Sequence, residues 1–258
     1  MAMNDPHVVA LEYLIEHGPD VVDWSRAAPL DEEEPSFRVQ AENGRVRFEL
    51  REHYASQEAA RSAVETDYIR NWEFVVGLAR GPNAFVLRFD RSEIVDRNPP
   101  SGPPRLNARA SVGGFTASAN LAPPTPPALP ELPPATIKRT PDVDSMYQRY
   151  LGHLEGREPL PGMAYFCLTV LQKMGGGASN AARHFSVSNK VLDRIRRLSA
   201  YKGGTGARKE DGREAPYTPE EEHFLRSAIK TLIHRAAEIE VESGPHPGRA
   251  KITLADFQ

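Results

Sequence analysis

The sequence predicts an α+β protein: a small antiparallel sheet with one packed helix, then a proline-rich spacer, then an all-helical domain. Three observations lead to this fold class. Before residue 100, apolar and polar residues alternate in several short runs, as in strands with one buried face. After residue 140, apolar residues recur every three or four positions, as in amphipathic helices. Between the two regions lie seven prolines within residues 122–134, a density that helices and central strands do not tolerate.

The strand pattern is clearest around Asn43-Gly44, because an Asn-Gly step between two alternating runs is a strong hairpin signal. The apolar residues of these two runs are Phe37, Val39, Ala41, Val46, Phe48 and Leu50. Two further alternating runs contain Val9, Leu11, Tyr13 and Ile15, and then Phe85, Leu87 and Phe89. We expect four or five antiparallel strands with one apolar face. The acidic residues 31–34 are predicted to form a solvated loop.

One long helix is predicted between these strands, beginning after Ser56, a suitable N-cap, and ending before Gly81-Pro82. Its apolar residues lie three or four positions apart, at Val64, Tyr68, Trp72, Val75 and Ala79. Charged residues gather on this helix and on the last strand. They are Glu73, Arg80, Arg88, Asp90, Glu93, Asp96 and Arg97. We interpret them as surface ion pairs, with a ligand pocket as the alternative.

Proline density sets the domain boundaries. We expect an α+β domain over residues 1–121, a proline-rich linker over 122–139, a helical domain over 140–242 and a tail over 243–258. The linker is interpreted as a semi-rigid polyproline spacer. Its PxxP steps, such as Pro127 to Pro130, also match the segments that SH3-like grooves bind.

The helical domain is predicted from capping signals and apolar spacing. Thr140-Pro141 begins one helix, and an apolar helix from Met163 to Met174 ends at three glycines. A capping box over residues 218–221 begins a long helix over 218–241. Its apolar seam consists of Leu225, Ile229, Leu232, Ala236 and Ile239. We expect the seam to pack within the chain, with a coiled coil between two chains as the alternative.

Within residues 178–197, apolar residues occupy five positions, Ala181, Phe185, Val187, Leu192 and Ile195, and the small Ala182 lies among them. This segment resembles the helix-turn-helix motif of DNA-binding proteins, in which these are the core spacings and the position of Ala182 is where the two helices touch. Ser188 precedes the second helix and is expected to cap it. The family usually has glycine in the turn, where this chain has Ser186. Backbone strain of about 1 kcal/mol is expected there.

The resemblance implies that the second helix enters the major groove of DNA, since Asn and Arg can make bidentate contacts with base edges. Residues 173–209 contain nine basic residues and one acid, Asp193, giving a local charge of +8. The end of this stretch, residues 201–209, is a glycine-rich basic loop, which is suited to lie along phosphates. The residues predicted to contact nucleic acid are Ser188, Asn189, Lys190, Arg194 and Arg197 in the groove, and Arg183, Lys202, Arg208 and Lys209 on the backbone.

Enzymatic signatures are weak. Neither glycine run has P-loop spacing, and the eight histidines show no metal-binding spacing. Ser199-Ala-Tyr-Lys202 matches an SxxK pattern without the companion motifs, and Cys167 lies among apolar residues. We expect no catalytic residue, cofactor or metal. No stretch reaches the roughly 20 apolar residues that span a bilayer, so no membrane partner is expected.

We therefore predict a cytoplasmic, non-enzymatic DNA-binding protein, with the first domain sensing a ligand or binding a partner. A single cysteine is consistent with a reducing compartment. The alternative is a protein-interaction or scaffold protein whose helical module does not bind DNA. It would dock its partners through the first domain or through the long helix over residues 218–241.

Overall fold

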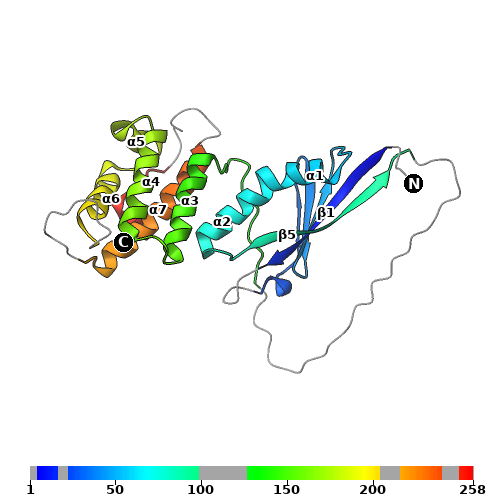
Figure 1. The fold of residues 1–258 in the computed structure, drawn as a ribbon, viewed down its shortest axis with the longest axis horizontal. Coiled ribbons are helices and arrows are strands. Elements are labelled where there is room, and N and C mark those ends of the chain that lie inside the picture. The colour runs from blue at the N-terminus through cyan, green and yellow to red at the C-terminus, as the bar shows by residue number, and fades with distance from the viewer. Residues whose placement is uncertain (1–4, 17–22, 99–126, 204–215, 240–249, 258) are drawn as a thin grey trace, which may run out of the picture. The chain divides into compact units, whose positions relative to one another are not determined.

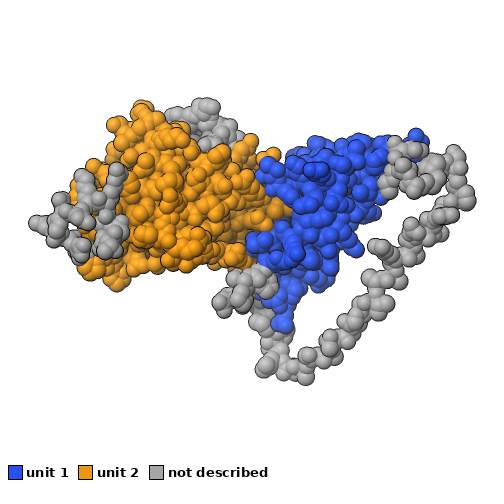
Figure 2. Space-filling model, in the orientation of Figure 1, with its two compact units in different colours: residues 1–66, 85–131 blue, residues 67–84, 132–258 orange. Residues whose placement is uncertain are grey.

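The computed structural model describes residues 5–16, 23–98, 127–203, 216–239 and 250–257. Its elements confirm the α+β class, with strands and one long helical segment before residue 97 and the other helices after residue 140 (Figure 1). The chain divides into two compact units, coloured separately in Figure 2. The sheet unit comprises residues 1–66 and 85–131, and the helical unit comprises residues 67–84 and 132–258.

The sheet unit contains five antiparallel strands in the order β2-β3-β4-β1-β5. Their bounds are β1 Pro6–Glu16, β2 Leu30–Glu33, β3 Phe37–Glu42, β4 Arg45–Leu50 and β5 Val86–Asp96. The predicted hairpin joins β3 to β4. Asn43 and Gly44 have φ angles of 54° and 73°, the left-handed geometry that a two-residue hairpin turn requires. The register pairs Val39 with Phe48, so both apolar runs lie on the buried face.

The alternating pattern predicted for β1 is wrong at its start. Val8, Ala10, Leu11 and Tyr13 are buried, whereas Val9 is only half-buried. Val8 pairs with Ile94 and Ala10 pairs with its neighbour Glu93, so Val9 is an extra residue without an opposite partner. Such a β-bulge moves the following side chains to the other face of the sheet.

The acidic residues 31–34 do not form the predicted loop, because Asp31 to Glu33 belong to the edge strand β2. Arg38 on β3 donates hydrogen bonds of 2.7 and 2.6 Å to the two carboxylate oxygens of Asp31. Charged side chains are common on edge strands, where they oppose pairing with other chains. The charge run thus marks the edge of the sheet.

The helix predicted to begin after Ser56 and end at Arg80 is present, but its residues are divided between the two units. It consists of α1 (Gln57–Val64), a π-helical segment (Glu65–Ile69) and α2 (Arg70–Arg80). Ser56 Oγ accepts a hydrogen bond from the Ala59 amide, and Gly81 ends the helix with a φ of 103°. The boundary between the units falls within the π-helical segment, so α2 belongs to the helical unit. The proline-based boundaries instead place α2 with the strands, in one domain over residues 1–121.

The helical unit is built from α2, α3 (Pro141–Leu154), α4 (Leu160–Met174), α5 (Ala178–His184), α6 (Asn189–Tyr201), α7 (Pro219–Ile239) and the short 3-10 helix η4 (Leu254–Phe257). Helix α4 begins three residues before the predicted Met163. The capping box is present, since Thr218 Oγ1 accepts from the Glu221 amide and Glu221 Oε2 accepts from the Thr218 amide.

The apolar seam of α7 is buried within the helical unit. Leu225, Ile229, Leu232 and Ala236 are completely inaccessible to solvent and share one core with α2, α3, α4 and α6. The side chain of Ile239 lies outside the described residues. The seam therefore packs within the chain, and these four residues are not available to a second one.

Candidate nucleic-acid interface

A four-residue turn joins helices α5 and α6, and both contribute buried residues to the same apolar core. The five residues assigned to its core, Ala181, Phe185, Val187, Leu192 and Ile195, are all buried, as is Ala182. The Val187 amide donates to the Ala182 carbonyl over 2.8 Å, which holds the turn against the end of α5. The local sequence thus builds a short helix, a tight turn and a second helix around one apolar cluster.

The turn residue Ser186 adopts a φ of +50°, in the left-handed region that glycine prefers. A non-glycine residue there costs on the order of 1 kcal/mol. The surrounding structure maintains this geometry, because Phe185 and Val187 on either side are buried. The position that the resemblance marked as unusual is thus the strained position of the turn.

Ser188 stands at the N-cap position of α6, but its side chain makes no capping hydrogen bond, contrary to the prediction. Its backbone amide instead donates to the Ile252 carbonyl over 2.8 Å. The Ile252 amide in turn donates to the Ser186 carbonyl over 2.9 Å. Residues 250–257, predicted only as a tail, therefore pair with the turn. The apolar residues Ile252, Leu254 and Phe257 were the sequence signal for this packing.

Helix α6 divides into a buried face and an exposed face. Asn189, Lys190 and Arg197 are exposed, as is Asp193, so the structure places three of the predicted groove residues on one accessible helix. Arg194 is different. Its guanidinium carbon lies 4.3 Å from the centre of the Phe224 ring on α7, and the side chain is half-buried. Arg194, also predicted for the groove, is therefore not among the exposed residues of α6, because stacking on an aromatic ring holds it against α7.

Several cations of the basic stretch are already paired. Lys202 Nζ lies 2.7 Å from Glu221, Arg196 lies 2.9 Å from Asp193, and Lys173 lies 3.3 Å from Asp142. Burial alone would raise the pKa of Glu221, but hydrogen bonds from Lys202 and the Thr218 amide outweigh it and lower that pKa. Lys202 is therefore a partner of α7, and its predicted phosphate contact would compete with this ion pair.

The remaining basic residues of the stretch fall into two groups. Arg183, Lys190 and Arg197 form no ion pair with any residue that the structure describes. Arg183 donates instead to the neutral Asn180 side chain over 3.0 Å. Arg208 and Lys209 lie outside the described residues. The cations of the described part of the stretch that form no ion pair with a described residue thus lie on α5 and α6.

A hollow of about 360 Å³ lies beside the turn. Its lining residues are Ser179, Ala182, Arg183, Ser186, Val187, Asn189 and Lys251. This set contains two cations, two hydroxyl groups and one amide, and no acid. Its chemistry suits an anionic ligand.

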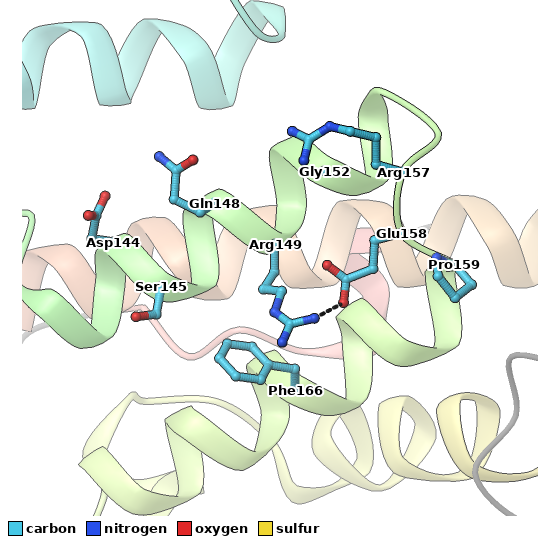
Figure 3. Close-up of a pocket in the computed structure, with 9 residues that line it drawn as sticks. All are labelled: Asp144, Ser145, Gln148, Arg149, Gly152, Arg157, Glu158, Pro159 and Phe166. Atoms are coloured by element: carbon cyan, nitrogen blue, oxygen red, sulfur yellow. Dashed lines mark hydrogen bonds and ion pairs between the residues drawn. The ribbon is translucent and has the colours of Figure 1, made fainter.

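A larger pocket of about 870 Å³ lies against α3 and the connection to α4 (Figure 3). Its two basic and two acidic lining residues are all in ion pairs. Arg149 lies 2.8 Å from Glu158 and stacks over Phe166, and Arg157 is paired with Glu155. Asp144 is held by Arg139 and Arg70. The lining of this pocket therefore has no excess of positive or negative charge.

Ser199 of the SxxK pattern and the single cysteine, Cys167, are both buried. Ser199 Oγ donates to the Ile195 carbonyl over 2.8 Å, as a structural serine within a helix does. Cys167 is inaccessible to solvent, and burial raises the pKa of its thiol, which disfavours the nucleophilic thiolate. Within the described ranges, no group of three or more His, Cys, Asp or Glu side chains is arranged to hold a metal ion.

The charged residues of the first domain form ion pairs across the sheet. Arg47 on β4 contacts Glu12 and Glu93, and Arg45 contacts Asp90. On the helix, Glu73 and Arg80 belong to the helical unit. The surface ion-pair interpretation therefore fits the strand residues of this cluster.

No family model, no curated protein and no solved structure matches this chain. In the described part of the chain, none of the helices combines the length and the apolar character needed to cross a membrane.

Proposed function

We propose that the helical unit binds DNA non-enzymatically, with α6 as the helix that enters the groove. One observation carries the proposal. Val191, Ile195 and Leu198 pack α6 into the core, whereas its opposite face is accessible. That face carries Asn189, the acid Asp193, and the cations Lys190 and Arg197, which form no ion pair with a described residue. A helix presented in this way matches the groove-reading geometry of helix-turn-helix proteins.

In this arrangement Asn189 and Arg197 have the chemistry to contact base edges, and Lys190 contacts a phosphate. Arg183, at the end of α5, contacts the phosphate backbone of the DNA. Arg194 and Lys202 act indirectly by fixing α6 against α7. The sheet unit would bind a ligand or a protein partner, and the chain would act in the cytoplasm.

Fluorescence anisotropy with a labelled duplex of random sequence tests the proposal. We expect binding at about 50 mM salt that weakens steeply towards about 200 mM, because phosphate contacts release counterions. Arg197→Glu should weaken binding at least tenfold. Lys138→Glu is the matched control, since Lys138 is exposed, belongs to the same unit and changes the charge equally. Absent binding at low salt, or equal affinities for the two variants, would refute the proposal.

A protein-interaction module is the competing function. The observation in its favour is that Lys173, Arg196 and Lys202 already have carboxylate partners, which reduces the charge available to DNA. If this function is correct, the wild-type chain shows no salt-dependent affinity for the duplex, and Arg197→Glu leaves the anisotropy unchanged.

A further inference from the structure

Three kinds of contact hold the segment over residues 250–257 in the helical unit. Two backbone hydrogen bonds, from Ile252 to Ser186 and from Ser188 to Ile252, form a parallel β-bridge. The Ile252 side chain is buried in the core of the helical unit. Phe257 packs edge-on against Phe224 of α7, with ring centres 5.5 Å apart. These contacts fix the position of the residues between them.

The contacts of Ile252 determine where the neighbouring Lys251 lies. Adjacent residues of an extended segment point to opposite sides, so an inward Ile252 directs Lys251 outward. Lys251 is exposed, forms no ion pair with a described residue, and lines the hollow beside the turn. The segment therefore brings a cation from a distant part of the sequence to the interface formed by α5 and α6.

The hollow combines groups that recognise a phosphate. Arg183 and Lys251 supply two positive charges, and Ser179 and Ser186 supply hydroxyl donors. None of the lining residues is acidic, in contrast to the pocket in Figure 3, where Glu158 neutralises Arg149. Arginine and lysine in the absence of a competing carboxylate favour an anion with several acceptor oxygens.

We propose that residues 250–257 complete a phosphate-binding site at the turn, in which Lys251 and Arg183 together hold one backbone phosphate of the bound duplex. This inference rests on the proposed function and adds to it a residue and a segment outside the helix-turn-helix-like region. The segment is then a part of the interface, and α5 and α6 provide only one side of the site.

Anisotropy titrations of the full chain over a range of salt concentrations test the inference. Lys251→Ala should reduce the dependence of log K on log salt by about 0.9 and weaken binding about tenfold at about 0.1 M salt. Lys251→Arg should retain binding. The double variant Arg183→Ala/Lys251→Ala should lose less affinity than the product of the single losses, since both residues hold one phosphate. Lys138→Ala, which removes the same charge elsewhere, is the matched control.

A second measurement separates failure of the site from failure of DNA binding. Inorganic phosphate is titrated into the full chain while the backbone amide signals of Ser186 and Asn189 are followed by NMR. Phosphate-dependent shifts that disappear in Lys251→Ala support the phosphate site. If those shifts occur but the wild-type chain does not bind the duplex, the assignment of the phosphate to DNA is overturned. If the duplex binds but Lys251→Ala matches Lys138→Ala and no shifts occur, the inference is overturned and the proposed function remains.

Discussion

The contact between α2 and α3 provides a sharp test of the unit boundary. Gly77 lies within α2, and a Cβ added there would collide with the hydroxyl oxygen of Tyr147 and lie 3.2 Å from its Cζ. The Tyr147 ring has little room to move, because Phe74 packs edge-on at 4.9 Å and Arg139 stacks at 5.0 Å. Replacing Gly77 by Ala therefore overfills this part of the core.

The expected magnitude follows from two opposing effects. Alanine gains about 1 kcal/mol over glycine in a helix interior, whereas overpacking a filled core costs about 1–3 kcal/mol. Gly77→Ala should thus lower the free energy of unfolding by about 1 kcal/mol. Burial raises the pKa of Tyr147 to about 12, so Tyr147→Phe changes no charge at neutral pH. In the double variant, Phe removes the colliding oxygen and should recover about 1 kcal/mol.

Urea unfolding followed by far-UV circular dichroism measures these changes. The matched control is Gly152→Ala in α3, because a Cβ at this buried glycine meets side-chain atoms only at 3.8 Å. That variant should be more stable by up to about 1 kcal/mol. Two results would show that the reasoning is wrong: a stabilised Gly77→Ala, or a Gly77→Ala defect that Tyr147→Phe does not reduce.

Three further predictions concern the turn, the capping box and the sheet. Ser186→Gly should stabilise the helical unit by about 0.5–1 kcal/mol in urea unfolding, since it relieves the positive φ; Ser186→Ala, which keeps the strain, should not. Glu221→Gln should cost about 1 kcal/mol at neutral pH. Because folding lowers the pKa of Glu221 below its ordinary 4.5, this contribution is complete above that pH and is lost as the pH falls through the folded-state pKa. An effect of Glu221→Gln that persists undiminished at pH about 3 would contradict the assignment. Burial and the charge of Arg97 lower the pKa of His7 from 6.5, so NMR titration should place it below that value. Stability of the sheet unit should then fall as the pH drops below about 6.5, whereas a His7 pKa above 6.5 would contradict this explanation.

Features that depend on a few neighbouring residues could be predicted from the sequence. The Asn43-Gly44 hairpin, the N-caps Ser56 and Thr140 and the capping box at Thr218 are set by side chains within three or four positions of the backbone groups they serve. The core spacing of residues 181–195 is local in the same sense, because one short helix and one turn determine it.

Features that depend on residues far apart in the chain could not be predicted from the sequence. The stacking that holds Arg194 against α7 requires Phe224, thirty positions along the chain. The bulge at Val9 follows from the register between β1 and β5, which alternation within β1 does not reveal. No local sequence pattern indicates that Lys251 belongs to the interface, since only the pairing of Ile252 with the turn brings it there.

The division of α1 and α2 between the units affects how the protein can be cut into fragments. The chain passes from one unit to the other after residues 66, 84 and 131, so neither unit is one continuous piece of sequence. A fragment over residues 1–121 would carry α2 without its core, exposing Phe74 and Leu78 to water. A fragment beginning at residue 140 would expose the complementary surface around Tyr147. Each fragment would expose apolar residues that belong to one shared core in the full chain. We therefore expect either fragment alone to aggregate, and the two to stay in solution only when they are produced together.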